Sequence, residues 1–599
     1  MRLKNERQFR PKLYAFLSFL LIVTVVQWQL VRRIDSHVIG RSFDDSFEAL
    51  WQLRWHHQAL FQQGVSPYFN PGIYYPNGWH LATGAQPVWY LVLLSPLVGL
   101  FGETVVYNSA LLATLVLSAF GVYLLTHKLT GNQLSGILAG LSYSTAPVLV
   151  MRLAGHLNVL IGAVFLPFVY VALYNAFSAE TTQKHRRWAF YVGLLLTLTF
   201  ISHWYFLFIA TFPALSLLFL RKLWSRRGLE IAVISLATAA ATTLPFALIT
   251  RQALASTYQS RPAPPLAIME ASSVSPARFF TPNPFNNLWH HLFDEMFVIS
   301  GEQHMVAIGY VTLFFAIAGL LFSQNRMKWL VALSGSIAFS LALGATLYWN
   351  NSRVELNALP ILSGLQAFFL QGVSVETGHV AIPLPSAMLY KLLPLYRSVR
   401  IASRFAIPLQ LCMAVLAGLG VTALGEFRPK LRPYLLLAIP LVLFETWQMP
   451  YQDFTPVSIN DRSLVTDYLQ TLAPDTALIE YPLGIVDKLA MYRQSFHNRP
   501  IANGYQSYDP DHLAAVRSDL GRWPEATAVP VLRAWDIKIV LINSRDTEQF
   551  LVNQLHRIDA IDGFCFVQKI EDSYLSFKST YVFRVLDVDE PCTTSIGSS

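Results

Sequence analysis

Three carboxylates lie close together near the start of the chain: Asp44, Asp45 and Glu48. A positioned carboxylate that takes a proton from an attacking hydroxyl speeds a reaction by roughly 10²- to 10⁴-fold. Asp44 and Glu48 share one face of a helix. The alternative is structural, because Ser42 with Asp45 forms a capping box and Asp44 favours a helix N-terminus. We predict that Asp44 or Asp45 is catalytic, with Glu48 as a further site candidate.

Three arginines follow one another late in the chain, at positions Arg397, Arg400 and Arg404. On a helix this spacing forms one stripe, and guanidinium groups match the geometry of phosphate oxygens. The alternative is that the arginines anchor the start of an apolar segment at a membrane interface. We predict that they bind the phosphate of a donor molecule.

Further polar residues lie in turns or loops between apolar segments, where a polar group is costly unless it faces a cavity or a partner. With Asp44 and Asp45, three of them could bind a divalent cation such as Mg²⁺ or Mn²⁺, although no spacing is a metal signature. The alternative is that the histidines are hydrogen-bonded structural residues. The candidates are His156, Asn158, His203, Glu302 and His304, of which His156, Glu302 and His304 belong to the possible metal set.

The segments that must position these residues are long and apolar. Hydrophobic residues make up 53% of the 599 residues, charged residues make up 13%, and the mean hydropathy is +0.40. About 20 apolar residues span a bilayer as a helix, and the first such stretch is Phe16 to Leu30 with its flanks. This composition excludes a soluble globular protein and a nucleic-acid-binding protein. Further apolar segments lie at 105–126, 133–150, 157–178, 189–203, 205–221, 229–250, 305–322, 329–347, 404–424 and 433–449.

Basic clusters between the apolar segments predict the orientation, because lysine and arginine are retained on the cytoplasmic side. Placing the clusters inside gives eleven crossings, or twelve if residues 86–103 also cross. We expect residues 86–103 to be re-entrant or interfacial. The N-terminus is then cytoplasmic, and the loops at 34–104, 251–304 and 349–403 lie outside with all the candidate residues. The predicted fold is therefore a polytopic all-α membrane domain over residues 1–450.

Residues 451–599 have a different pattern, with apolar runs of strand length. Strands are predicted at 477–481, 537–542, 564–569 and 580–585, and helices at 463–472 and 547–555. This pattern predicts a soluble extracytoplasmic α/β domain. Cys565 and Cys592 allow one disulfide, which indicates an oxidising compartment. Residues 491–505 are dense in aromatic and hydrogen-bonding side chains, so they form either an acceptor-binding or lid element or part of the domain's ordinary structure.

The first outside loop resembles that of the GT-C superfamily of membrane glycosyltransferases. The resemblance rests on the acidic pair, the turn from Tyr75 to Gly78, and Gln86-Pro87 before the next apolar run. It covers residues 10–450 and extends best to bacterial relatives of the protein mannosyltransferase and aminoarabinose transferase group. The resemblance implies a polyprenyl-phosphate sugar donor and a first-loop carboxylate that acts as base or metal ligand. The matching residues are Asp44, which we favour, and Asp45.

Together these features predict an inverting hexosyl- or pentosyltransferase of a bacterial plasma membrane, with a glycan, lipid or protein as acceptor. One alternative is a flippase or exporter of lipid-linked sugars, which needs phosphate-binding arginines but no reacting carboxylate. Another is a non-catalytic protein of envelope-glycan assembly. The sequence has no P-loop, dinucleotide fingerprint, Ser-His-Asp order or paired-cysteine zinc spacing, which argues against ATP-driven transport, redox catalysis and zinc hydrolysis.

Overall fold

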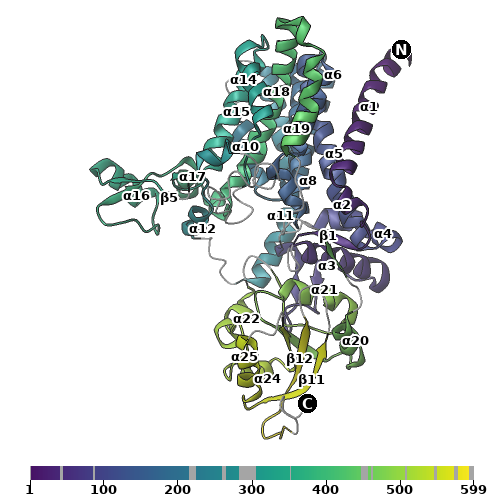
Figure 1. Cartoon of the computed structure of the whole chain (residues 1–599), viewed down its shortest axis with the longest axis vertical. Helices are drawn as coiled ribbons and strands as arrows, with labels where there is room; N and C mark the ends of the chain where they lie inside the picture. The colour runs from purple at the N-terminus through teal and green to yellow at the C-terminus, as the bar shows by residue number, and fades with distance from the viewer. Residues whose placement is uncertain are drawn as a thin grey trace.

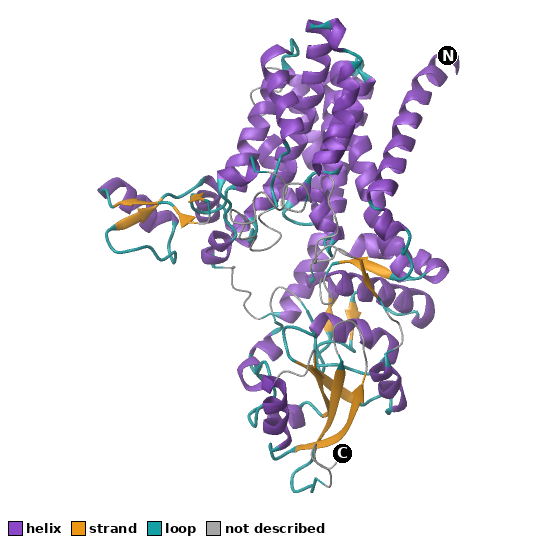
Figure 2. Cartoon of the chain, viewed as in Figure 1, coloured by secondary structure: helices purple, strands orange, loops and turns teal. Residues whose placement is uncertain are grey.

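The computed structural model describes residues 2–40, 45–84, 88–214, 224–258, 265–281, 286, 305–350, 352–446, 456–459, 463–505, 509–544, 549–571 and 578–592. Figure 1 shows a bundle of long helices and, at one end of it, a smaller domain that contains the C-terminus. Helices dominate the bundle, and the longest strands lie in the C-terminal domain (Figure 2). This architecture agrees with the predicted order of a helical domain followed by an α/β domain. The predicted boundary at residue 450 lies outside the described residues.

The bundle is built around α18 (Ala406–Phe427), most of whose residues are buried. It packs closely against α14 (Tyr310–Phe322). A Cβ atom on Gly420 would lie 1.9 Å from the carbonyl oxygen of Phe315, and one on Gly319 would lie 2.2 Å from that of Leu416. The two helices therefore touch through their backbones, as small residues allow between helices in membranes. The other bundle helices are α1 (Arg2–Val26), α5 (Glu103–Thr130), α6 (Gln133–Ser144), α7 (Pro147–Val150), α8 (Leu157–Ser178), α9 (Thr182–Ser202), α10 (Phe206–Ala214), α11 (Arg226–Thr257), α15 (Met327–Ala342) and α19 (Ala438–Thr446).

Four helices in the described residues are long and apolar enough to span a bilayer, or five if a bent pair is one span. The four are α5, α8, α11 and α18 with the turn before it. The bent pair consists of α6 and the helical residues Pro147–Leu153. Five shorter apolar helices accompany them. The chain is therefore an integral membrane protein. Length and composition identify fewer spans than the eleven or twelve predicted, so the number of crossings stays a prediction.

The segment predicted to be re-entrant or interfacial contains α4 (Val88–Phe101), a helix of 14 residues. At 1.5 Å per residue it is about 21 Å long, which is shorter than the hydrocarbon core of a bilayer at about 30 Å. Figure 1 shows α4 beside α3 (Asp45–His57), at the end of the bundle. The re-entrant or interfacial placement of residues 86–103 stays a prediction.

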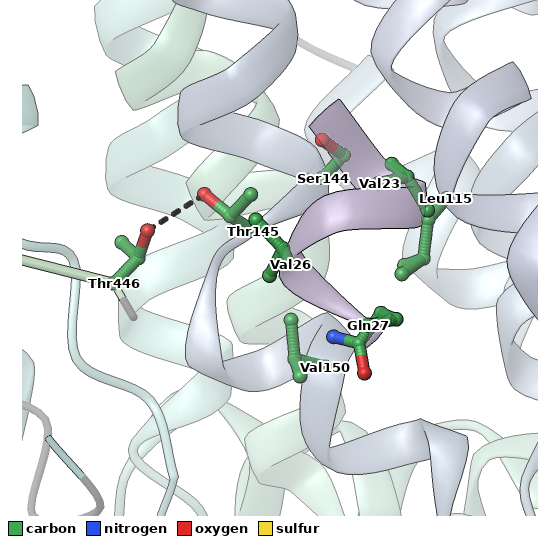
Figure 3. Close-up of a pocket in the computed structure, with 8 residues that line it drawn as sticks. All are labelled: Val23, Val26, Gln27, Leu115, Ser144, Thr145, Val150 and Thr446. Atoms are coloured by element: carbon green, nitrogen blue, oxygen red, sulfur yellow. Dashed lines mark hydrogen bonds between the residues drawn. The ribbon is translucent and has the colours of Figure 1, made fainter. Parts of the chain in front are cut away.

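A small apolar pocket lies where α1, α5, α6, α7 and α19 meet (Figure 3). Val23 and Leu115 line it, and the Thr446 hydroxyl donates a hydrogen bond of 2.9 Å to the Thr145 hydroxyl beside it. None of the described residues that line this pocket is titratable. It is a packing gap between helices rather than a chemical site.

The first loop is joined to the C-terminal domain by backbone hydrogen bonds. The strand β1 (His37–Ile39) pairs antiparallel with β8 (Pro456–Ser458). Farther along the loop, the Tyr75 N–H donates to the Ile501 carbonyl at 3.0 Å, and the Ile501 N–H donates to the Gly72 carbonyl at 2.9 Å. The helix α2 (Trp28–Val31) precedes β1, and the first loop also contains the π-helical η1 (Gln58–Gln63), β2 (Phe69–Asn70), β3 (Trp79–His80) and η2 (Leu81–Thr83).

The C-terminal domain has a four-stranded sheet in the order β11-β12-β10-β9. The strand β9 (Ala477–Tyr481) is parallel to β10 (Ile537–Ser544), and β12 (Ser579–Val585) pairs antiparallel with both β10 and β11 (Phe564–Glu571). These four strands agree with the predicted ones to within two residues. The helices are α20 (Leu464–Thr471), α21 (Asp487–His497), α22 (Asp511–Ala514), α23 (Arg517–Leu520), α24 (Ala528–Ala534) and α25 (Gln549–Asp559).

The loop between α15 and α18 forms a side arm that projects from the end of the bundle (Figure 1). We call residues 348–397 the arm. It contains β4 (Tyr348–Trp349), β5 (Ser352–Arg353), β6 (Glu355–Asn357), α16 (Pro360–Phe369), β7 (His379–Ala381), α17 (Pro385–Leu392) and most of η8 (Pro394–Ser398). The remaining short elements are η3 (Met151–Leu153), α12 (Leu266–Ala271), η6 (Pro276–Phe279), η9 (Ala402–Phe405), η10 (Pro429–Leu431) and η11 (Tyr434–Leu437).

The C-terminal domain contains the predicted disulfide, between Cys565 and Cys592, which are 27 residues apart. A loop of this size contributes roughly 3 kcal/mol in the chain-entropy account of disulfides. We expect Cys592→Ser to lower the urea concentration at which the C-terminal domain becomes sensitive to protease, and a reductant to do the same to the wild type. Cys412→Ser is the control, because Cys412 is a free thiol, and this variant should keep the wild-type response to reductant. Equal protease sensitivity with and without reductant would contradict the prediction.

Candidate functional site

Asp45 is the first residue of α3, and two other segments contact its carboxylate. The Lys488 ammonium donates to Asp45 Oδ1, and His156 Nε2 lies 3.4 Å from Asp45 Oδ2. His156 precedes α8 in a turn where Gly155 has a φ of +90° and where an added Cβ would lie 2.6 Å from the Asp45 Cβ. This close approach requires glycine, and it brings the histidine to the start of α3.

The C-terminal domain supplies Lys488 from the first turn of α21. The Asp487 carboxylate fixes this turn by accepting bonds from the Gly484 N–H at 2.9 Å and from the Asn503 amide at 2.8 Å. Lys488 also lies over the Tyr505 ring, with its nitrogen 4.0 Å from the ring centroid. Its side chain is only 14% exposed, so the ammonium is held largely by the carboxylate and the ring.

The helix α21 packs on α3 and so fixes the position of Lys488 relative to Asp45. The Phe47 and Tyr492 rings meet edge to face at 5.6 Å, and the Trp51 indole donates to the Gln494 amide oxygen at 3.2 Å. On the other side of α21, the guanidinium of Arg493 donates to the buried Glu480 carboxylate at 2.9 Å. The site is therefore shared by the first loop, the turn before α8 and the C-terminal domain.

The surroundings of the two acidic residues of α3 shift their pKa values in opposite directions. Burial acts to raise the pKa of Asp45, but Lys488, His156 and Arg404 together overcome this effect and hold the pKa below its usual value. Burial, with the nearby Asp45 charge, raises the pKa of Glu48 to about 8. Glu48 Oε1 accepts a hydrogen bond of 2.8 Å from Gln52. At neutral pH one carboxyl is ionised and its neighbour one turn later is protonated.

Arg404 and His203, which are 201 residues apart, form the second part of the site. Arg404 Nη1 donates to His203 Nε2 at 2.8 Å, and the guanidinium carbon lies 5.1 Å from the centroid of the Tyr205 ring. The Tyr205 hydroxyl accepts a bond of 2.7 Å from the Arg400 N–H. Arg404 is buried, and its charge acts on both His203 and Asp45. The structure thus joins the two predicted groups, carboxylate and arginine, in one region.

The prediction that Arg397, Arg400 and Arg404 form one helical stripe is wrong. Arg397 lies on the 3₁₀ turn η8 and Arg404 on the 3₁₀ turn η9, and Arg400 lies in the non-helical residues between these turns. The chain therefore turns Arg397 away from the other two: its Nε donates to the Tyr390 carbonyl at 3.4 Å, and the side chain is exposed. Only Arg400 and Arg404 lie near His203 and the carboxylate.

The other predicted residues have different outcomes. Asn158 is buried in the first turn of α8, where its Oδ1 accepts from the Val159 N–H at 2.9 Å. Asp44, Glu302 and His304 lie outside the described residues. The sequence analysis missed Lys488. This lysine belongs to the C-terminal α/β domain, and no sequence pattern around it indicates that it contacts the first loop. The sequence analysis also missed Arg152, which is buried near His203 and whose unusual depth in an apolar segment was the available signal.

A cavity of about 430 Å³ opens beside His203. It lies between α4, α9 and α11, and apolar and aromatic side chains such as Trp89, Phe246 and Leu254 make up most of its wall. Arg251 is its one cationic lining residue among those described. The cavity combines an apolar wall with one arginine and a histidine that contacts the buried Arg404.

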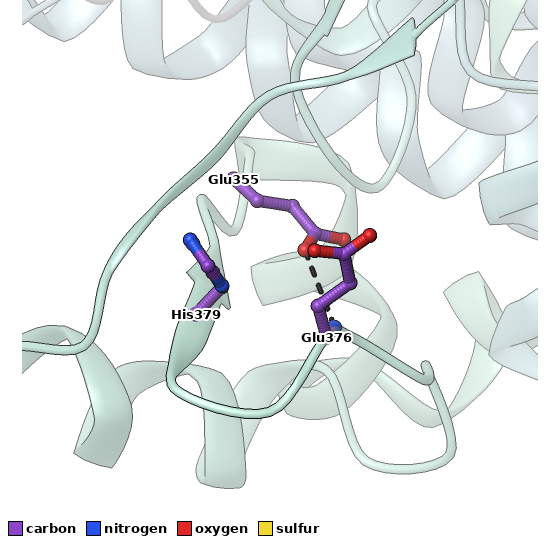
Figure 4. Close-up of side chains that lie close together, drawn as sticks. All are labelled: Glu355, Glu376 and His379. Atoms are coloured by element: carbon purple, nitrogen blue, oxygen red, sulfur yellow. Dashed lines mark hydrogen bonds between the residues drawn. The ribbon is translucent and has the colours of Figure 1, made fainter.

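One group in the described residues could supply three metal ligands. The ligand atoms of Glu355, Glu376 and His379 lie within 4.8 Å of one another on the arm (Figure 4). Glu355 is already bonded by Arg353, at 2.5 Å, and by the Glu376 N–H. The arm projects on the opposite side of the bundle end from α3 (Figure 1), so this group is not part of the site around Asp45.

Comparison with solved structures identifies the fold. Arabinofuranosyltransferase AftD from Mycobacteria matches with a TM-score of 0.53 and 12% identity, over 97% of this chain and 40% of that chain. The oligosaccharyltransferase of Archaeoglobus fulgidus, tethered to an acceptor peptide with the NVT sequon, matches with a TM-score of 0.52 and 13% identity, over 97% of this chain and 75% of that one. The same oligosaccharyltransferase in complex with Zn and sulfate matches with a TM-score of 0.50 and 13% identity, over 94% of this chain and 73% of that one.

These solved structures are GT-C glycosyltransferases, so the predicted resemblance to that superfamily is confirmed at the level of the fold. No family model matches the sequence, and no curated protein matches it either. The chain spans less than half the length of the arabinofuranosyltransferase.

The raised pKa of Glu48 predicts that the folded protein loses stability as the pH rises. Between the ordinary pKa of 4.5 and about 8, the unfolded chain releases the Glu48 proton while the folded chain keeps it, so unfolding becomes more favourable. Glu48→Gln cannot ionise, and we expect its thermal midpoint to fall less than that of the wild type between pH 5 and pH 8. The exposed Glu525→Gln is the control and should follow the wild type. Parallel pH profiles for wild type and Glu48→Gln would contradict a protonated Glu48.

Proposed function

We propose that this protein is a membrane glycosyltransferase that moves a sugar from a polyprenyl-phosphate donor to a hydroxyl of an extracytoplasmic acceptor. The observation that carries the proposal is the meeting of one ionised carboxylate, Asp45, with Lys488, His156 and Arg404 in a chain with the GT-C fold. The hydroxyl needs a proton acceptor, and the departing phosphate needs positive charge. This site supplies both.

In the proposed reaction the acceptor oxygen attacks the anomeric carbon of the sugar, and the bond from that carbon to the phosphate oxygen breaks. The hydroxyl proton passes to a carboxylate of the first loop, and the lipid phosphate leaves with the bonding electrons. A single displacement of this kind inverts the anomeric carbon. Asp45 is the described candidate for the base, and Asp44 remains the second.

Arg404 and Lys488 are the proposed partners of the donor phosphate. Both side chains are largely buried, where a guanidinium or ammonium binds a phosphate more strongly than it would in water. A phosphate that takes Lys488 from Asp45 would also raise the pKa of Asp45, since the carboxylate would lose its nearest cation. Donor binding would then make the carboxylate a better base at the moment it is needed.

The cavity beside His203 is the proposed place for the first prenyl units of the donor. Its wall is mostly apolar, as a hydrocarbon chain requires, and Arg251 lies among the residues that line it. The residues around the cavity belong to the ends of helices, so a lipid could enter from the bilayer with its phosphate toward Arg404. An exposed surface for the acceptor is expected on the C-terminal domain near Tyr505.

One solved structure of the oligosaccharyltransferase is a complex with Zn and sulfate, and the sequence leaves a divalent cation such as Mg²⁺ or Mn²⁺ open here. Around Asp45, no three acidic or histidine side chains of the described residues bring their ligand atoms close enough together to hold a metal, and Lys488 already occupies one oxygen of Asp45. These residues alone do not form a metal site. Asp44, Glu302 and His304, the other members of the possible metal set, lie outside the described residues.

The location follows from the predicted topology. We propose a bacterial plasma membrane protein with a cytoplasmic N-terminus and with the C-terminal domain outside. The sugar, the acceptor and the length of the lipid are left open by the residues of the site.

We expect Asp45→Asn to reduce sugar transfer by about 10²-fold or more, because the amide keeps the shape of the carboxylate but cannot take the proton. The assay uses the full-length protein in lipid with radiolabelled polyprenyl-phosphate hexoses and pentoses, with and without a divalent cation, and includes Asp44→Asn. Asp35→Asn is the matched control, since Asp35 is exposed ten residues earlier in the same connection.

A loss of folding must be separated from a loss of chemistry, because Asp45→Asn leaves Lys488 without its carboxylate. The double variant Asp45→Asn with Lys488→Met removes that unbalanced charge. If the double variant regained transfer, the single loss would have come from folding and Asp45 would not be the base. Transfer that survives both Asp44→Asn and Asp45→Asn would show that neither carboxylate is the base. Absence of transfer by the wild type with every donor would favour the flippase or assembly alternatives.

We expect Arg404→Gln to raise the KM for the lipid donor at least tenfold, with a smaller change in kcat. A lost charge-assisted hydrogen bond costs about 1.5 to 3 kcal/mol, and each 1.4 kcal/mol is a tenfold change in affinity. Arg428→Gln is the control, since Arg428 is exposed at the opposite end of α18. An unchanged donor KM in Arg404→Gln would show that Arg404 does not bind the phosphate.

A further inference from the structure

The arm exposes a row of large apolar side chains that no other described part of the protein covers. None of the residues of α16 is buried. Ile361, Leu365 and Phe368 are 79%, 37% and 51% exposed, and their spacing of four and three residues places them on one face of the helix. An exposed apolar face of a helix beside a membrane-spanning bundle is typical of an element that lies in the membrane interface.

A second apolar group follows at the other end of the arm. Leu392, Leu393 and Leu395, from the last residue of α17 to the start of η8, are 61%, 39% and 71% exposed. Single exposed leucines are ordinary, but clustered ones mark a surface with a partner. Arg397 comes directly after this group and is exposed as well.

A cavity of about 320 Å³ lies between α12, α16 and η8. Lys391 and Arg397 both line it, together with Gln371 and Tyr390, and no carboxylate is among its described lining residues. Lys391 donates to the Gln371 amide oxygen at 3.3 Å, and its ammonium lies 5.2 Å from the centroid of the Phe368 ring. Two cations without a carboxylate favour an anionic occupant.

The place of the cavity in the fold selects the source of the anion. Figure 1 shows α16 and α17 beside the end of the bundle that faces the C-terminal domain, at the level where the long helices end. At this level a bilayer changes from hydrocarbon to headgroups. Apolar side chains next to basic ones match that change, because the leucines enter the hydrocarbon while the cations meet phosphate.

We propose that the arm binds the headgroup of an anionic phospholipid of the outer leaflet. Lys391 and Arg397 hold its phosphate in the cavity, and the acyl chains lie along α16 and the leucines at 392–395. This gives Arg397, which the candidate site does not use, a different phosphate to bind. The arm then anchors the loop between α15 and α18 on the membrane surface, independently of the proposed sugar transfer.

The test follows the environment of α16 in the full-length protein. A cysteine at the exposed position Ala367→Cys takes an environment-sensitive fluorophore, since the native cysteines are a buried thiol and a disulfide. We expect the emission to shift to the blue in nanodiscs of phosphatidylcholine with phosphatidylglycerol relative to phosphatidylcholine alone. The double variant Lys391→Gln with Arg397→Gln should lose this shift. A label at Ala473→Cys, exposed on the C-terminal domain, should show none.

Leu392→Ser with Leu395→Ser is a second variant, which keeps both cations and should weaken the same shift. Equal emission in the two lipid compositions would overturn the proposal, and so would a shift that persists without Lys391 and Arg397. Inorganic phosphate separates the two sources of the anion. If it produced the shift in lipid-free detergent, the cavity would bind a free phosphate group and the assignment to a phospholipid would be wrong.

Discussion

The junction between the helical bundle and the C-terminal domain depends on α3, which is held from two sides at once. The turn at Gly155 lies close to Asp45, the first residue of α3. On the other side, α21 of the C-terminal domain packs along α3 and contacts Phe47 and Trp51. The hydrogen bonds between the loop at Gly72 and the chain at Ile501 close the same junction. The domain and the bundle therefore cannot separate without exposing aromatic side chains to water, which links the geometry of the carboxylate to the docking of a whole domain.

The junction between α3 and α21 contains two acidic side chains close together, with cations placed beside only one of them. Glu48 is buried and Asp45, one helical turn earlier, is partly buried, so both cannot ionise cheaply, and the cations determine which one does. Lys488 and His156 contact Asp45, whereas Glu48 accepts a hydrogen bond from the neutral amide of Gln52. The result is an ionised carboxylate beside a carboxyl that keeps its proton.

Much of this arrangement could be predicted from the sequence, because topology alone collects residues on one side of a membrane. The basic clusters assigned Asp45, His203 and Arg404 to the same side, and the structure brings them together. Contacts with the C-terminal domain could not be predicted, since the order of residues does not specify how a domain docks. The prediction of an arginine stripe was wrong for a local reason. Regular spacing places residues on one stripe only along a continuous helix, and the chain around Arg397 makes a 3₁₀ turn instead.

The position of Lys488 in the chain sets an order of events in biosynthesis. Asp45 is synthesised more than four hundred residues earlier, and the bundle helices lie between the two in the sequence. The site around Asp45 is therefore incomplete while the bundle is being inserted, and it closes only after the last domain has folded against α3. A chain interrupted before α21 would place a carboxylate at the membrane surface without the lysine that balances its charge.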